Sequence, residues 1–284
     1  MNAKELQALV SLLDDEDAEV SAHVEQKIMS LGHEVIPFLE MEWEKSFNPI
    51  LQKRLEEMVH TIQFDALLHR LKAWNESSEQ DLLEGMWLVA TFQYPDLDLA
   101  KLREQIEQLY YEAWLDFKPN LNPYDYVKIL NSVLFGKLRF GANTKNFHAP
   151  ANSMINSILE TRKGNPIALC SIYLLIAQKL GLPIYGVNLP NLFILTYKTE
   201  EVQFYINAFN RGLIFTKEDI DNYIQHLQLS PNPIFYQPCT HADIVRRMLR
   251  NLEYSFEKLG DHAKSEEIKR LIIQISDSED TGII

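Results

Sequence analysis

The two cysteines are the side chains of this sequence that are best suited to covalent chemistry, because a thiolate readily attacks a carbonyl carbon. Cys170 lies within an almost wholly apolar segment, residues 166–180, which predicts a buried helix. Burial raises the pKa of a thiol and blocks access to it, so we expect Cys170 to be a structural core residue. The alternative is a hydrolase or acyltransferase that uses Cys170 as a non-standard nucleophile. Other candidates for that role are Cys239, Ser153 and Ser171.

Metal and cofactor chemistry finds little support in the sequence. Cys239 and His241 form a single Cys-x-His pair, and no second pair lies near it, whereas a structural zinc ion needs four ligands. No Gly-x-x-x-x-Gly-Lys-Ser/Thr segment is present to hold a phosphate group. We expect no metal site and no bound cofactor.

The balance of charge argues against polyanionic partners. The 284 residues include 40 acidic and 27 basic side chains, for a formal net charge of −13. Such a surface repels phosphate backbones and anionic lipids, so we expect neither a nucleic-acid nor a membrane partner. No apolar run approaches the roughly 20 residues of a membrane span, and residues 1–5 open into an amphipathic helix without a signal-peptide pattern. These features predict a cytoplasmic protein and leave its oligomeric state open.

Three sections of the chain must position these groups, and the first, residues 1–76, is helical. Apolar residues recur at helical spacing over 6–13 and 18–31, with an acidic turn at residues 14–17 between them. Together with the segment that follows, these helices resemble a HEAT-type repeat, in which helices stack through their apolar faces. The pattern allows a second, degenerate copy over residues 48–74.

The second section, residues 77–238, combines helices with a small sheet and follows a polar break at residues 75–79. Helical patterns cover residues 79–93, 98–117, 123–134, 152–162 and 166–180. Residues 136–152 lack periodicity, and we expect an ordered loop there. Strand patterns cover residues 184–189, 192–197, 202–208 and 213–215. Because the turns between the strands are short, we expect an antiparallel sheet packed against the apolar helix.

The third section, residues 239–276, predicts a helical hairpin. Helices at 241–258 and 262–275 flank Gly260-Asp261, an arrangement similar to a single tetratricopeptide-type unit. Residues 277–284 are expected to be a disordered tail. The predicted fold class is α+β and predominantly helical, with a central helix on a small antiparallel sheet flanked by helical modules.

Short motifs follow one another in a fixed order along the second section. They are Tyr94-Pro95-Asp96-Leu97-Asp98, Phe135-Gly136, Phe140-Gly141-Ala142-Asn143, Asn152-Ser153-Met154-Ile155-Asn156, Arg162-Lys163-Gly164-Asn165-Pro166-Ile167, Leu180-Gly181-Leu182-Pro183 and Gly186-Val187-Asn188-Leu189-Pro190. In this order and spacing, the chain from about residue 79 to 275 resembles bacterial transglutaminase-like proteins of the invasion-regulator (SirB) type. The resemblance implies a transglutaminase-like (papain-like) core over residues 77–238.

The resemblance also implies three positions for catalytic groups. In that fold a cysteine at a helix N-terminus is the nucleophile, a histidine on a strand is the base, and an aspartate on the next strand orients the histidine. The corresponding positions in this chain are Pro166, Leu192 and Asn207. Proline cannot act as the nucleophile, leucine cannot act as the base, and asparagine cannot replace the aspartate. In the active enzymes the three catalytic groups act as a unit, so no partial activity is expected. We therefore expect a catalytically inactive protein.

Polar side chains would surround such a vestigial cleft. By the same resemblance they are Arg162, Asn165, Asn191 and Asn210, and His148 could line the cleft from the preceding loop. Amide and guanidinium groups bind peptides and terminal carboxylates well, so we expect a protein or peptide partner. The alternative is structural: Arg162 would pair with a carboxylate, and the asparagines would serve turns and strand ends.

Overall fold

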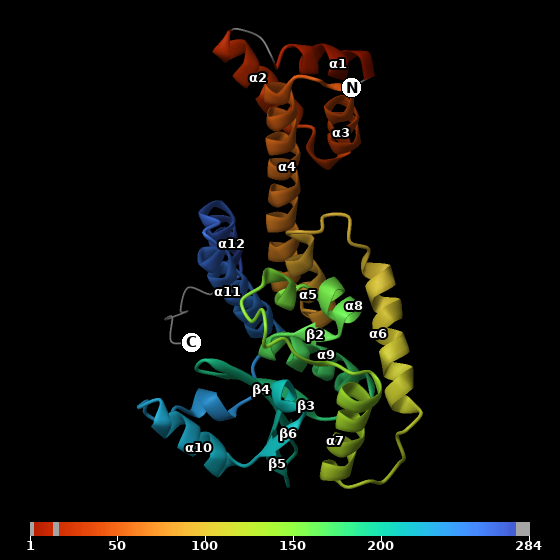
Figure 1. The fold of residues 1–284 in the computed structure, drawn as a ribbon, viewed down its shortest axis with the longest axis vertical. Coiled ribbons are helices and arrows are strands. Elements are labelled where there is room, and N and C mark those ends of the chain that lie inside the picture. The colour runs from red at the N-terminus through yellow and green to blue at the C-terminus, as the bar shows by residue number, and fades with distance from the viewer. Residues whose placement is uncertain (1–2, 14–16, 277–284) are drawn as a thin grey trace. The chain divides into compact units, whose positions relative to one another are not determined.

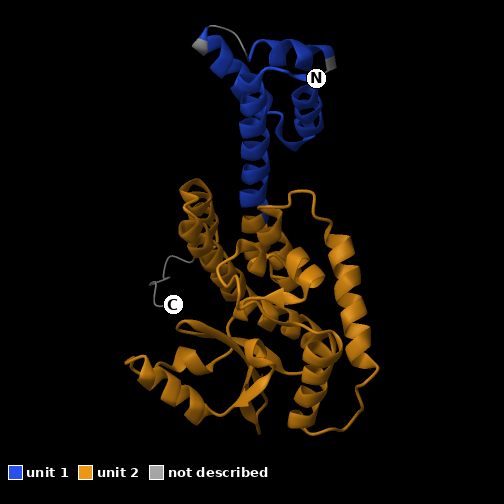
Figure 2. Cartoon of the chain, viewed as in Figure 1, with its two compact units in different colours: residues 1–70 blue, residues 71–284 orange. Residues whose placement is uncertain are grey.

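The computed structural model describes residues 3–13 and 17–276, which are mostly helical with two small sheets (Figure 1). The chain divides into two compact units, residues 1–70 and 71–284 (Figure 2). The division falls within a helix, a few residues before the polar segment 75–79. The predicted disordered tail, residues 277–284, lies outside the described residues.

The first unit consists of helices around an apolar core. Its elements are α1 (Ala3–Ser11), α2 (Ala18–Met29), the 3₁₀ helix η1 (Gly32–Val35), α3 (Ile36–Lys45) and the first part of α4 (Pro49–Glu76). Fully buried side chains of its core include Leu13, Ile28, Leu39 and Leu55. Asp17 caps α2 by accepting a hydrogen bond from the Glu19 N–H at 2.9 Å. Residues 14–16 of the acidic turn lie outside the described part of the chain.

Helix α4 corrects one prediction. Residues 48–74 do not form a second copy of a two-helix repeat, because Pro49–Glu76 is one continuous helix. The segment has no glycine and no proline after Pro49. Nothing in it therefore interrupts the backbone hydrogen bonds of the helix.

The second unit surrounds a four-stranded sheet with helices. Its sheet consists of β3 (Ile184–Leu189), β4 (Leu192–Lys198), β5 (Gln203–Asn207) and β6 (Leu213–Phe215). Its helices are α5 (Leu82–Thr91), α6 (Leu99–Trp114), α7 (Pro123–Asn131), α8 (Ile155–Thr161), α9 (Pro166–Lys179), α10 (Lys217–His226), α11 (His241–Leu259) and α12 (His262–Gln274). The strands lie in the order β3-β4-β5-β6 and all pairs are antiparallel, as the short turns predict.

Helix α9 lies at the centre of the second unit. Every residue from Ile167 to Ala177 is buried, which explains why the segment has no polar face. The helix packs against β3 and β4 on one side and also contacts α5, α6 and α11. Gly181 follows its C-terminus with a φ of +71°, a conformation that favours glycine.

The predicted loop at residues 136–152 is more structured than expected. A π-helical turn, Ser132–Lys137, extends α7. Further on, β1 (Gly141–Ala142) pairs in parallel with β2 (Lys163–Gly164), and a 3₁₀ helix, Pro150–Ser153, precedes α8. Elements this short leave no periodic pattern in the sequence, so the pattern could not predict them.

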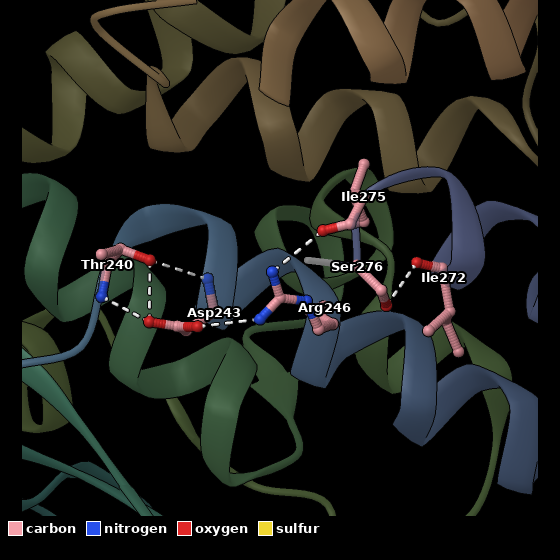
Figure 3. Close-up of polar contacts among 6 residues, drawn as sticks. All are labelled: Thr240, Asp243, Arg246, Ile272, Ile275 and Ser276. Carbon is pink, nitrogen blue, oxygen red and sulfur yellow. Dashed lines mark hydrogen bonds and ion pairs between the residues drawn. The ribbon is translucent and has the colours of Figure 1, made fainter. Parts of the chain in front are cut away.

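Helices α11 and α12 form the predicted hairpin (Figure 1). Thr240 and Asp243 begin α11 with a capping box, in which each side chain accepts a hydrogen bond from the other residue's N–H. Arg246 then joins the two helices, because its Nη1 lies 3.0 Å from Asp243 Oδ1 and its Nη2 donates to the Ile275 carbonyl at 2.9 Å (Figure 3). Gly260 ends α11 with a φ of +75°.

Within residues 3–13 and 17–276, no helix combines the length and the apolar character that a membrane span needs.

Candidate functional site

The start of α9 is fixed by two local features. Asn165 is the N-cap: its Oδ1 accepts a hydrogen bond from the Ala168 N–H at 3.0 Å, and its Nδ2 donates to Ser153 Oγ at 2.9 Å. Pro166 occupies the first helical position, where a missing N–H costs nothing. The position at which the resemblance places a nucleophile is thus a half-buried pyrrolidine ring.

Both cysteines are poorly placed for nucleophilic attack. Cys170 is fully buried, and its thiol donates to the Phe193 carbonyl at 3.5 Å. Burial, as the main cause, raises the pKa of the Cys170 thiol far above its usual value. Burial likewise raises the pKa of Cys239 to about 12, with the Asp243 carboxylate adding to the effect. At neutral pH both side chains are therefore neutral thiols, which are weak nucleophiles.

A pocket of about 410 Å³ opens beside the start of α9. The residues that line it come from the loop before α8, the start of α9, the β3–β4 turn and α11: Phe147, His148, Asn165, Pro166, Ile167, Asn191, Phe193, Arg247, Asn251, Tyr254 and Ser255. The tertiary structure thus brings four separate segments of the second unit to one place. We call it the α9 pocket.

Four of the predicted residues line the α9 pocket, namely His148, Asn165, Pro166 and Asn191. Asn191 is held in the β3–β4 turn at a φ of +58°. The His148 ring lies edge-on to Tyr254 of α11, with ring centroids 5.2 Å apart. The loop histidine is therefore packed against an aromatic wall of the pocket.

The other predicted residues do not line it. Arg162 ends α8 in a left-handed conformation, and its guanidinium lies over the Phe140 ring at 4.8 Å. Burial lowers the pKa of the Arg162 guanidinium. In the part of the chain that the structure describes, Arg162 has no ion pair, so the alternative expectation of a carboxylate partner is wrong.

Three more of the predicted residues lie outside the pocket lining, namely Leu192, Asn207 and Asn210. Asn207 Oδ1 accepts a hydrogen bond from the Asn210 N–H at 3.1 Å, which closes a turn after β5. Leu192 is half-buried and packs against the apolar cluster that contains Val187 and Ile194. Asn210 is exposed and lies outside the lining of the α9 pocket.

The sequence patterns missed the contribution of α11. Arg247, Asn251 and Tyr254 follow one another at helical spacing and lie on the face of α11 that borders the pocket. Arg247 Nη1 donates to Asn188 Oδ1 of β3 at 3.3 Å. The spacing of four and then three residues between these side chains was a visible signal, but nothing in the sequence indicates that α11 returns to the start of α9.

Two other pockets contain none of the predicted residues. One, of about 670 Å³, lies at the opposite end of α9 and includes Tyr110, Trp114 and Tyr197 in its walls. The other, of about 400 Å³, lies in the first unit beside Trp43 and His60. Although the first of these is larger, neither contains a residue of the predicted cleft, so the α9 pocket is the better candidate site.

The groups in the α9 pocket are suited to binding. They offer a guanidinium, three amides, an imidazole and two hydroxyls, but no thiol and no carboxylate. No cluster of three histidine, cysteine, aspartate or glutamate side chains that could hold a metal ion occurs among the described residues. The arrangement can therefore hold a ligand through hydrogen bonds and one positive charge.

Comparisons with known proteins extend these observations. A model of the transglutaminase-like superfamily matches residues 100–250. A UPF0162 protein of Xylella fastidiosa (strain 9a5c) is 30% identical over 194 residues, which cover 64% of this chain and 69% of that protein. A UPF0162 protein of Pasteurella multocida (strain Pm70) is 31% identical over 113 residues, 40% of this chain and 43% of that protein.

The chain is also similar, over a shorter part of its length, to animal proteins. F-box only protein 21 of Mus musculus is 29% identical over 132 residues, which cover 43% of this chain and 20% of that protein. No solved structure matches the chain.

Proposed function

This chain belongs to the transglutaminase-like superfamily and is homologous to the UPF0162 proteins, and from that premise we propose that it is a catalytically inactive member that binds a protein or peptide partner. The observation that carries the proposal is the start of α9. At the position where a nucleophile is expected the chain has Pro166, and beside it lies a pocket of hydrogen-bonding side chains without a thiol.

The other two expected catalytic positions support the same proposal. Leu192 has no group that could accept a proton, and it packs into an apolar cluster. The Asn207 amide is engaged with the Asn210 N–H. Neither side chain lines the α9 pocket, and the imidazole that does line it, that of His148, comes from the loop before α8 and not from the strand on which the base is expected.

The proposal extends to the parts of the chain. It assigns the chain to the invasion-regulator (SirB) type, with a papain-like core over residues 77–238. It takes residues 1–76 as a HEAT-like region and residues 239–276 as a tetratricopeptide-like hairpin. Helical modules of these kinds commonly offer concave surfaces to other proteins. The hairpin helix α11 supports this assignment, because it provides part of the pocket wall.

The competing proposal is a thiol-dependent hydrolase or acyltransferase with Cys170 as nucleophile. The structure offers it little support, because the Cys170 side chain has no exposed surface. Its hydrogen bond goes to the Phe193 carbonyl, and among the described residues no histidine is bonded to it. A thiol in such a place has neither access to substrate nor a base to deprotonate it.

We expect the native protein to react slowly with iodoacetamide at pH 7.5. Only the thiolate reacts, and the raised pKa values of both cysteines keep the thiolate fraction very small. Alkylation, followed by mass spectrometry of the intact protein, should be at least about tenfold slower than in the urea-unfolded chain. The rate at Cys239 should keep rising with pH and should not level off below about pH 12, because the thiolate fraction grows until the pH reaches the pKa.

The variants Cys170→Ser and Cys239→Ser assign any reaction to one thiol. Incubation with an electrophilic glutamine analogue should leave the native protein unmodified. Rapid stoichiometric labelling that disappears in Cys170→Ser but not in Cys239→Ser would establish a reactive thiol and overturn the proposed inactivity. The urea-unfolded protein shows that the reagent can modify both side chains once they are exposed.

A further inference from the structure

The α9 pocket has a positive wall in a strongly acidic chain. Of its eleven lining residues, Arg247 has a guanidinium and none is an aspartate or a glutamate. The chain as a whole has 40 acidic side chains against 27 basic ones. The absence of carboxylates from the lining reverses this balance locally, and it favours an anionic ligand.

Arg247 lacks the counter-charge that a cation withdrawn from water usually has. The side chain is half-buried, and its Nη1 donates to a neutral acceptor, Asn188 Oδ1. Within residues 3–13 and 17–276 it forms no ion pair with a carboxylate. Burial, followed by the positive charge of Arg250, lowers the pKa of the Arg247 guanidinium, which reflects the same environment. A bound anion would compensate this charge, and a carboxylate matches the fork of a guanidinium.

A second hydrogen-bond donor belongs to a residue that lines the same pocket. The N–H of Ile167, the second residue of α9, has no acceptor in the part of the chain that the structure describes. The N–H of Ala168, by contrast, is already bonded to the Asn165 side chain. The Ile167 N–H can therefore contribute a hydrogen bond to an oxygen atom that enters the pocket.

Part of the remaining lining is apolar, beside the side chains of His148, Ser255 and three asparagines. Phe147, Phe193 and Tyr254 contribute aromatic rings, and Pro166 contributes its pyrrolidine ring. A volume of about 410 Å³ is in the range of pockets that hold small ligands or single side chains. A simple inorganic anion would leave these walls uncovered, whereas an anion joined to an apolar group would cover them.

We infer that the α9 pocket binds a carboxylate that is joined to an apolar group, with Arg247 as the principal contact. The C-terminus of a peptide with a large apolar last residue has this chemistry, and so does a small arylalkyl acid. The inference deepens the proposed function and rests on it, since it names the chemical group that the binding site recognises.

Isothermal titration of the full chain tests the inference with three probes. They are N-acetyl-Gly-Phe with a free carboxylate, the same dipeptide as its carboxamide, and phenylacetate. We expect the free carboxylate to bind at least about tenfold more tightly than the carboxamide, since hydrogen bonds to a charged group contribute about 1.5–3 kcal/mol. Tighter binding of the dipeptide than of phenylacetate identifies a peptide terminus, and equal binding identifies a small acid. Either result supports carboxylate recognition.

Two substitutions on α11 distinguish a direct contact between Arg247 and the carboxylate from a general effect of positive charge near the pocket. Arg247→Gln should weaken binding of the free carboxylate at least about tenfold, to the level of the carboxamide. Arg250→Gln removes the same charge nearby from a residue that does not line the pocket, and it should change binding less than about threefold. Thermal unfolding of each variant checks that it is folded.

The possible failures are distinguishable from those of the proposed function. Equal binding of carboxylate and carboxamide would overturn the inference but leave a peptide-binding pocket. The absence of binding by any probe at millimolar concentration, or unchanged binding in folded Arg247→Gln, would also overturn it. Catalytic inactivity is tested separately by thiol labelling, which does not depend on these titrations.

Discussion

Replacing Gly85 by alanine is expected to lower the free energy of unfolding by about 2 kcal/mol, although alanine favours a helix by about 1 kcal/mol over glycine. Gly85 lies in α5, which packs against α11. A Cβ atom at this position would lie 2.6 Å from Cζ2 of Trp74 and 2.6 Å from Cγ2 of Val245. Urea unfolding followed by circular dichroism measures the change.

The indole ring cannot move aside easily. Trp74 is 4% exposed, and its Nε1 donates to the Asp81 carbonyl at 2.8 Å. Displacing the ring would break this hydrogen bond and disturb the packing around it. The destabilisation by overpacking should therefore outweigh the gain in helix propensity.

Two further variants make the result interpretable. Gly136→Ala adds the same methyl group in a helical turn where the nearest atom, Ser132 Oγ, lies 3.9 Å away, and it should leave stability unchanged or raise it by up to about 1 kcal/mol. Val245→Ala removes one of the two clashing atoms, so the double variant Gly85→Ala/Val245→Ala should lose less stability than the sum of the two single changes. Wild-type or higher stability of Gly85→Ala alone would show that α5 and α11 can separate without loss.

Gly85 illustrates what the sequence could not reveal. From the sequence, a glycine within a helical pattern indicates only a modest loss of helix propensity. The position requires glycine because the side chains of Trp74 and Val245, which are distant in sequence, pack against it. Sequence patterns predicted the boundaries of an element correctly where neighbouring residues determine them. The strands at residues 184–189 and 213–215 and the start of α9 at Pro166 lie where the patterns place them, since turns and caps involve neighbouring residues.

The sequence predicted the part of the α9 pocket near the start of α9 and the β3–β4 turn, but not the part that α11 provides. His148, Asn165 and Asn191 line the α9 pocket as expected, because the motifs that predict them lie beside the start of α9 or in the β3–β4 turn. Arg162 turns instead toward the Phe140 ring. The wall provided by α11, including Arg247, depends on where the hairpin packs, and no periodicity within α11 carries that information.

The largest effect of removing a single charge is expected at Arg246. We expect Arg246→Ala to lower the free energy of unfolding by about 2 kcal/mol. The residue is 9% exposed, and its guanidinium links Asp243 near the start of α11 to the Ile275 carbonyl just after α12 (Figure 3). Breaking a buried ion pair ordinarily costs about 3–5 kcal/mol, but the Asp243 side chain is 34% exposed, so water offsets part of the loss.

The position of the lost contact predicts which helix responds. Asp243 remains bonded to Thr240 in the capping box, whereas the Ile275 carbonyl loses the guanidinium as donor. Amide hydrogen exchange should therefore accelerate more in α12 than in the first turn of α11. Lys128→Ala is the matched control, because Lys128 forms an exposed ion pair of the same spacing with Asp125 at 3.2 Å and should change stability by less than about 0.5 kcal/mol. Equal and small effects of the two substitutions would contradict this prediction. They would mean that the apolar contacts of the hairpin stabilise it and that the contacts of Arg246 add nothing measurable.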